Sequence, residues 1–141
     1  MKRKTKKPGY LHVRPLKADI TAAMHRSKKV PLSVYCPNFK GKTKNVEAGN
    51  EIDHIVPINL WEKMGLKGDP HASSNLQSIP SECHREKTQR DRKIMTHYDR
   101  NTDNKEIMRK IRGCKRRYND PAKIWKCLQK TFKDYQQKKT N

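Results

Sequence analysis

The sequence predicts an α+β fold in which a small strand–loop–strand–helix core lies between basic, mostly helical extensions. A β-branched run at 51–56 is typical of a strand, a brief second strand is expected at 76–79, and a helical pattern follows it at once. The final third of the chain carries apolar residues at helical spacing in a strongly basic background. A length of 141 residues fits one modest domain with extensions.

Residues 1–33 predict a basic arm with one short helix. The first 17 residues are rich in lysine and broken by prolines and a glycine, which is typical of a flexible arm. A helix is expected from Asp19 to Lys29, with Asp19 as its cap and Ile20, Ala23 and Met24 as its apolar stripe.

Residues 34–98 are expected to form the strand–loop–strand–helix core. Loop and short strand are expected up to residue 50, and a strand from Glu51 to Val56 ends before Pro57. A short helix over 58–66, a loop over 67–74 and a second strand over 76–79 follow. A helix capped by Ser81 then runs to about Tyr98.

Residues 99–141 predict a basic helical extension. Asp120-Pro121 is a strong helix start, because the acid caps the helix and proline suits its first turn. Two apolar faces are expected, and their aromatic residues suit packing better than base stacking. The faces consist of Ile107, Met108, Ile111, Cys114 and Tyr118, and of Ile124, Trp125, Leu128, Phe132 and Tyr135.

The charge distribution favours a nucleic-acid partner. Lysine and arginine number 34 against 14 acids, and the net charge of +20 far exceeds what solubility needs. The net charge is +11 over residues 1–50, −3 over 51–84 and +12 over 85–141. An acidic centre suits a cation, and basic flanks suit the phosphate backbone of a polyanion.

The composition also limits the size of the core and the cell compartment. Leucine, isoleucine, valine and phenylalanine sum to 23 of 141 residues, which predicts a small core, helped by a metal, with flanks that order fully on a partner. No apolar run approaches the roughly 18 residues that span a bilayer, and the basic start is not followed by a secretory apolar segment. The four cysteines form no disulfide-scaffold pattern, so a reducing cytoplasm is expected.

Three short motifs carry the chemistry of the central segment. They are EIDHIVP, SNLQSIP and ECHREKT, which contain Asp53-His54, Asn75 and His84. With the order strand, loop, strand, helix, these motifs resemble the HNH endonuclease family and its ββα-metal fold over roughly residues 34–90. The fold class expected is therefore α+β with a small ββα-metal (HNH) core.

The resemblance implies a role for each of these residues. His54 corresponds to the general base that activates water, and Asp53 and His84 correspond to ligands of one divalent metal ion. Asn75 either coordinates the metal or holds His54 in orientation, so the catalytic set is His54, Asn75 and His84. Mg²⁺ is the metal expected, with Mn²⁺ or another transition metal as the alternative, and no small-molecule cofactor is expected.

The adjacency of Asp53 and His54 is a geometric difficulty. Neighbours in a regular strand point to opposite faces, so both can serve one site only if the strand twists or ends there. The other histidines have weaker claims. His71 lies in the loop before Asn75, where it could approach the metal, and His12, His25 and His97 are interpreted as incidental.

Several basic residues are candidate nucleic-acid contacts. Arg85 and Lys87 follow His84 closely enough to reach a phosphate, although ordinary solvent exposure explains them equally well. The basic helical extension would hold the duplex through Arg109, Lys110, Arg112, Lys115, Arg116 and Arg117.

The cysteine pattern departs from that of many similar nucleases, which bind a structural zinc through two CxxC pairs. Here the pairs would be Cys36 to Phe39 and Pro80 to Cys83, and each has lost one cysteine. Two thiolates do not complete a tetrahedral zinc site, so Cys36 and Cys83 are expected as neighbouring buried thiols. A zinc completed by Cys114, Cys127 or a histidine stays open.

The resemblance implies a metal-dependent endonuclease that cuts double-stranded DNA to 5′-phosphate and 3′-hydroxyl ends. A monomer would nick, and a double-strand break would need two successive cuts or a weak dimer. Small basic proteins of this design resemble free-standing phage homing endonucleases, which implies a bacterial or phage-infected cell. Restriction, packaging-associated and toxin-type nucleases share the same core, so these roles stay open. The alternative is a non-catalytic DNA- or RNA-binding protein that reuses the fold.

Overall fold

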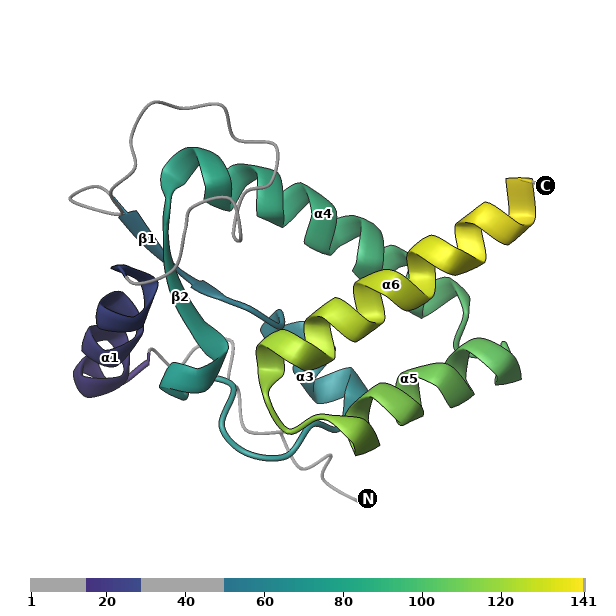
Figure 1. Cartoon of the computed structure of the whole chain (residues 1–141), viewed down its shortest axis with the longest axis horizontal. Helices are drawn as coiled ribbons and strands as arrows, with labels where there is room; N and C mark the ends of the chain where they lie inside the picture. Colours follow the sequence, from purple (N-terminus) through teal and green to yellow (C-terminus); the bar gives the residue numbers. More distant parts are fainter. Residues whose placement is uncertain (1–14, 29–49, 141) are drawn as a thin grey trace, which may run out of the picture.

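The computed structural model describes residues 15–28 and 50–140. The predicted arm over 1–14, the predicted loop and strand before residue 50, and His12, Cys36 and Phe39 lie outside the described residues. Figure 1 shows a two-stranded sheet, a long helix α4 (Ser81–Arg100) that extends from the end of the second strand, and a C-terminal pair of helices at the far side of the molecule from the sheet. The observed architecture is the predicted α+β class with a small strand–strand–helix core.

The core is an antiparallel β-hairpin followed directly by a long helix. β1 (Asn50–His54) pairs with β2 (Leu76–Pro80), and α4 (Ser81–Arg100) follows without a linker. The register places Asp53 opposite Gln77 and His54 opposite Leu76. Pro80 occupies the cap position of α4, so the helix begins without the predicted Ser81 side-chain cap.

The connection between the strands is compact and contains α3 (Ile58–Met64) and the short 3-10 helix η2 (Ser73–Asn75). α3 stops at Gly65, whose φ of 63° is a left-handed conformation that glycine adopts without steric cost. This connection brings the loop around His71 back to the end of β1. The connection between the strands therefore folds back against the end of β1 at His54.

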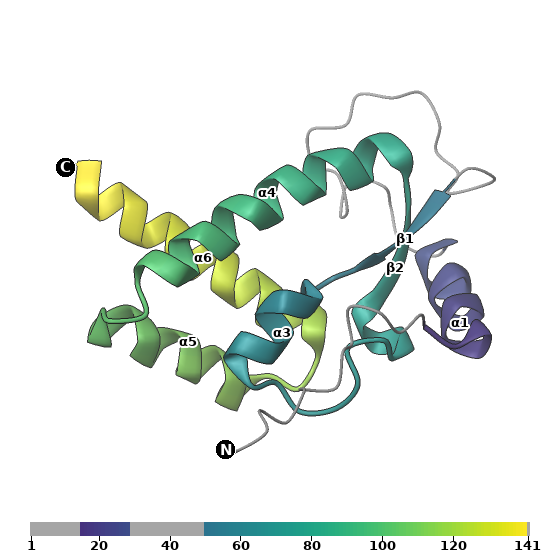
Figure 2. The ribbon, with the colours of Figure 1, turned by 180° about the vertical axis from the view of Figure 1, so that it is seen from behind.

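α1 (Lys17–Lys28) covers the outer edge of β2, and Figure 2 shows it beside the sheet, away from α4. Ser27 Oγ accepts a hydrogen bond from Ser78 N, and the Arg26 guanidinium donates to the Leu76 carbonyl. The helix begins before Asp19, and this side chain accepts from Ser73 N, 54 residues away, instead of capping its own helix. The predicted helix is thus confirmed, and its predicted cap is wrong.

The C-terminal residues form a helical hairpin that shares the main hydrophobic core. α5 (Lys105–Arg117) is capped by the Asn104 side chain, and α6 (Pro121–Thr140) starts at the predicted position, where Asp120 Oδ1 accepts from Ala122 N. Their apolar faces pack with residues of α3 and α4 in one cluster. Its members include Leu60, Trp61, Ile94, Tyr98, Ile107, Ile111, Ile124, Trp125, Leu128 and Phe132.

The described cysteines form disulfides, although the sequence shows no disulfide pattern and predicts Cys83 as a buried thiol. Cys114 on α5 and Cys127 on α6 form a disulfide with a Cα–Cα distance of 5.7 Å, because the hairpin brings the two helices side by side. Cys83 is fully buried and is also disulfide-bonded. Sequence spacing gave no signal for this pairing. Among the described residues, no helix has the length and apolar character needed to cross a membrane.

Candidate active site

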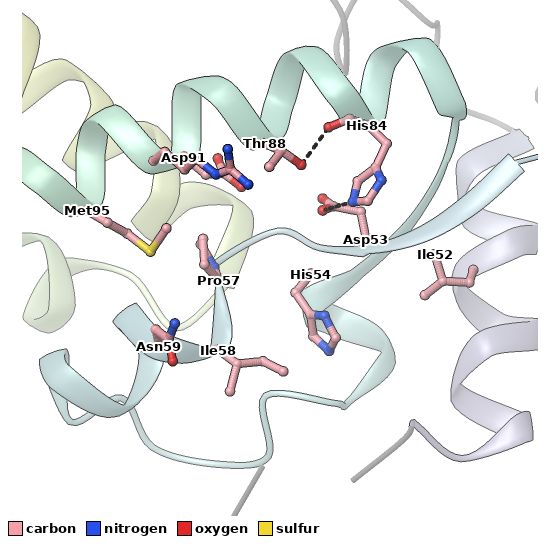
Figure 3. A pocket seen from close by; sticks show the side chains of 11 residues that line it. Ile52, Asp53, His54, Pro57, Ile58, Asn59, His84, Thr88, Asp91 and Met95 are labelled. Carbon is pink, nitrogen blue, oxygen red and sulfur yellow. Dashed lines mark hydrogen bonds and ion pairs between the residues drawn. The ribbon is translucent and has the colours of Figure 1, made fainter. Parts of the chain in front are cut away.

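An open pocket of about 270 Å³ lies between the end of β1 and the inner face of α4 (Figure 3). Three of the residues singled out by sequence line it together. The lining consists of Ile52, Asp53, His54, Pro57, Ile58, Asn59, His84, Thr88, Asp91, Arg92 and Met95. Its polar residues come mainly from one strand end and from successive turns of one helix.

Asp53 and His84 are in contact on the wall of this pocket. His84 Nε2 lies 3.4 Å from Asp53 Oδ1, and His84 Nδ1 is hydrogen-bonded to Glu51. Glu51 and Asp53 reach the same histidine because residues two apart in a strand share a face. The hydrogen bond to Asp53 raises the pKa of His84 above its ordinary value, and the bond to Glu51 adds to this.

The Asp53 carboxylate is buried but ionised. Burial acts to raise the pKa of Asp53, but the hydrogen bond to His84 and the charge of Lys87 outweigh it, so the pKa lies below its ordinary value. Gln77, its partner across the sheet, donates to Asp53 Oδ2 over 2.7 Å. The strand register therefore supplies one of the bonds that hold this carboxylate in place.

The buried Lys87 ammonium contacts several groups of the site at once. It lies 3.0 Å from Asp53 Oδ2, donates to the His54 carbonyl over 3.0 Å and pairs with Asp91. The Trp125 ring of α6 lies 5.5 Å from the ammonium. The residue is only 5% exposed. Lys87 is therefore placed to hold the end of β1, not to present a free cation to DNA as the sequence suggested.

His54 projects on the other side of β1 from the Asp53 carboxylate and the His84 ring (Figure 3). The expected alternation of strand neighbours thus holds, and β1 ends at His54, so its ring still lines the pocket. His54 Nε2 lies 3.0 Å from Nδ1 of His71. Burial, reinforced by His71, lowers the pKa of His54 to about 4, so its imidazole is neutral at pH 7.

Asn75 is fully buried and its side chain is bonded to the backbone on both sides of the connection. Its Oδ1 accepts from Val56 N over 2.8 Å, and its Nδ2 donates to the Val56 and Pro70 carbonyls over 3.1 and 3.0 Å. Its own carbonyl accepts from Ile55 N. Asn75 thus fastens the segment after His54 to the segment before His71, and its side chain does not touch the Asp53–His84 pair.

The donor set around Asp53 suits a divalent cation that also binds water or phosphate. Asp53 offers a carboxylate oxygen, and the bond from His84 Nδ1 to Glu51 leaves Nε2 as the coordinating nitrogen, as a carboxylate partner does in many metal sites. The described residues contain no group of three or more His, Cys, Asp or Glu placed to hold a metal. Two protein ligands would leave further coordination positions of such an ion for water or a substrate phosphate.

The other predicted nucleic-acid contacts fall into two groups. Lys115 donates to the Met64 carbonyl and Lys110 lies 3.6 Å from Glu106, so both have partners within the protein. Exposed guanidinium groups remain beside α4 and along α5, and Arg117 lies over the Tyr118 ring. The exposed members of the predicted set are Arg85, Arg109, Lys110, Arg112, Arg116 and Arg117.

Three residues of the site, Glu51, Asp91 and Gln77, were not identified from the sequence. Glu51 carried a usable signal, because strand alternation places it on the face of Asp53. Asp91 carried another, since it lies four residues after Lys87 on a helix. Burial raises the pKa of Asp91 to about 6 despite this ion pair. The place of Gln77 depends on the strand register, which no local pattern reveals. His71 was expected near the metal, and its contact with His54 depends on the path of the loop.

Comparison with known proteins gives a family for the segment that carries the site. Residues 34–90 match the family model described as HNH endonuclease. No curated protein and no solved structure shows a significant match to the chain. The matched segment contains Asp53, His54, Asn75 and His84, and it ends within α4. This central segment therefore carries the HNH endonuclease signature, which indicates nuclease activity.

Proposed function

We propose that the protein is a metal-dependent endonuclease that hydrolyses phosphodiester bonds of double-stranded DNA. The observation that carries the proposal is the convergence of Asp53, His84 and a neutral His54 on one pocket. A carboxylate, an imidazole ligand and a separate imidazole base are the groups that phosphodiester hydrolysis requires. The basic flanks would supply the grip on the DNA backbone.

In this proposal His54 takes a proton from the attacking water. The water oxygen forms a bond to phosphorus, the bond between phosphorus and the 3′ oxygen breaks, and the leaving oxygen takes up a proton from solvent. The products are a 5′-phosphate and a 3′-hydroxyl. The pKa of about 4 leaves the His54 imidazole neutral at pH 7, as proton acceptance requires, and it also makes this imidazole a weaker base than an ordinary histidine.

Asp53 and His84 would hold one divalent ion, with Mg²⁺ as the first candidate and Mn²⁺ as the second. When bound, this ion neutralises charge on the phosphate and stabilises the leaving oxygen. Glu51 orients His84, and Lys87 and Gln77 hold Asp53. Asn75 acts by fixing the backbone next to His54 and His71 and not as a ligand.

One site of this kind cuts one strand at a time, so a monomer would nick and a dimer would be needed for a concerted double-strand break. The small core and basic flanks also suit a free-standing homing endonuclease that recognises a particular sequence. Specificity of that kind would come from base contacts, which charge alone does not define.

The test is cleavage of supercoiled plasmid and of genomic DNA from the source organism, in Mg²⁺ or Mn²⁺, with sequencing of the new ends. Wild type should produce 5′-phosphate ends, and EDTA should abolish them. His54→Ala should cut at least about 100-fold more slowly, the usual contribution of general base catalysis. His25→Ala is the matched control, because His25 lies exposed on α1, away from the site.

Two results would contradict the proposal. Cleavage by His54→Ala at the wild-type rate would remove His54 from the chemistry. Retention of DNA on a gel, with no new ends on either substrate in any metal, would instead support the binding-protein alternative.

A further inference from the structure

We propose that His71 is a positioning residue that fixes the tautomer of His54. It does so by accepting a hydrogen bond from His54 Nε2–H, which leaves His54 Nδ1 as the proton acceptor. This inference rests on the proposed function and assigns a role to a histidine that the catalytic set does not include.

The first observation is the direct contact between the two imidazoles. His54 Nε2 and His71 Nδ1 are 3.0 Å apart, which is hydrogen-bond distance, and the rings meet edge to face with their centroids 5.0 Å apart. His71 is only 4% exposed, so water competes little for this bond. Among the described residues, His54 Nδ1 makes no hydrogen bond, so one ring nitrogen is held and the other is left for chemistry.

The second observation is that both histidines are anchored by one side chain. The Asn75 amide bonds both polar groups of Val56, two residues after His54, and the carbonyl of Pro70, one residue before His71. Asp69 Oδ1 in turn accepts from His71 N over 2.8 Å. The His71 ring is therefore held against His54 by its own loop.

The chemistry then selects one of two tautomers. A single hydrogen lies between the two nitrogens. If His71 donated it, His54 would carry its own proton on Nδ1 and could not act as a base there. If His54 donates it, Nδ1 has a free lone pair. Only the second arrangement makes His54 a base, and it requires His71 Nδ1 to be an acceptor.

The experiment reads the tautomer and the rate separately. In ¹⁵N-labelled, metal-free protein, long-range ¹H–¹⁵N correlation spectra report which ring nitrogen of His54 carries the proton. Wild type should show His54 protonated on Nε2. His71→Leu should give a mixture of tautomers and lower kcat for DNA cleavage about 10- to 100-fold, with KM nearly unchanged.

Two further variants separate positioning from packing. His71→Asn places an amide oxygen near the position of Nδ1 and should restore both the tautomer and most of kcat. His71→Gln, whose oxygen lies one bond further out, should restore less. If His71→Leu fails to fold, this Asn and Gln pair carries the same comparison.

Three outcomes would overturn the proposal. They are His54 protonated on Nδ1 in wild type, wild-type kcat in His71→Leu, and equal rates in the Asn and Gln variants. Failure of the proposed function is distinguishable, because it would appear as absent cleavage by wild type while the spectra still report the bond between His54 and His71.

Discussion

Replacing Asn75 by alanine would leave three buried backbone groups without their side-chain partner. These groups are the amide and carbonyl of Val56 and the carbonyl of Pro70, and neither residue has appreciable solvent exposure. An unsatisfied buried polar group costs about 1–3 kcal/mol. The three together, which are not strictly additive, should lower the free energy of unfolding by about 3–6 kcal/mol. This is a large share of the roughly 5–15 kcal/mol typical of a domain.

Asn75→Asp is the sharper perturbation because it preserves the shape of the side chain. One oxygen can still accept from Val56 N, but the second faces two carbonyl oxygens where an NH₂ group donated before. The loss of two donated bonds should cost about 2–4 kcal/mol. Asn119→Asp, at an exposed position before α6, is the matched control and should change stability by less than about 0.5 kcal/mol.

Urea unfolding followed by circular dichroism measures these differences, and Mn²⁺ titration provides a second readout. A metal ligand behaves oppositely to a backbone clamp, because aspartate is a better ligand than asparagine for a hard cation. If Asn75→Asp kept wild-type stability and bound Mn²⁺ more tightly, the clamp assignment would be refuted and Asn75 would become a ligand.

Three other perturbations probe the rest of the site. Lys87→Met should lower the free energy of unfolding, measured in urea, by about 3–5 kcal/mol, because it leaves the buried Asp53 and Asp91 carboxylates without their cation. Adding Asp91→Asn should recover part of this loss. Wild-type stability of the single variant would contradict the ion-pair argument. Changing Arg109 and Arg112 on α5 to alanine should lower the slope of log K against log salt by about 2 in DNA-binding titrations, and an unchanged slope would exclude phosphate contacts there. Mn²⁺ affinity, measured by calorimetry, should fall as the pH is lowered through the raised pKa of His84, because the proton competes with the metal, and His84→Ala should bind weakly at every pH.

The residues that sequence located correctly are those whose role follows from local order. The helix that begins at Ser81 and the helix start at Asp120-Pro121 each depend on neighbouring residues, and the structure has both. The first strand is also present, but it ends at His54, two residues before the predicted end at Val56. Asp53 and His84 were singled out by motif spacing, and the fold brings them to 3.4 Å.

The features that escaped prediction depend on contacts between distant segments. Lys87 looks like an exposed cation in sequence, and its burial follows only from the packing of α6 and β1 against α4. The partner of Asp19 lies 54 residues away, so a helix cap was the only local interpretation available. The boundaries at 33/34 and 98/99 stay predictions, although the C-terminal helices share a core with α3 and α4.

The docking of α1 on β2 also bears on how small a working piece of this chain can be. The segment that matches the family model begins at residue 34, so it lacks the helix that bonds the outer edge of β2. It also ends at residue 90, before the C-terminal helices that share the core with Leu60 and Trp61. A polypeptide trimmed to that segment would present an unpaired strand edge, which favours pairing with other chains. Homology alone therefore marks the chemical centre of the molecule but not its smallest independently stable unit.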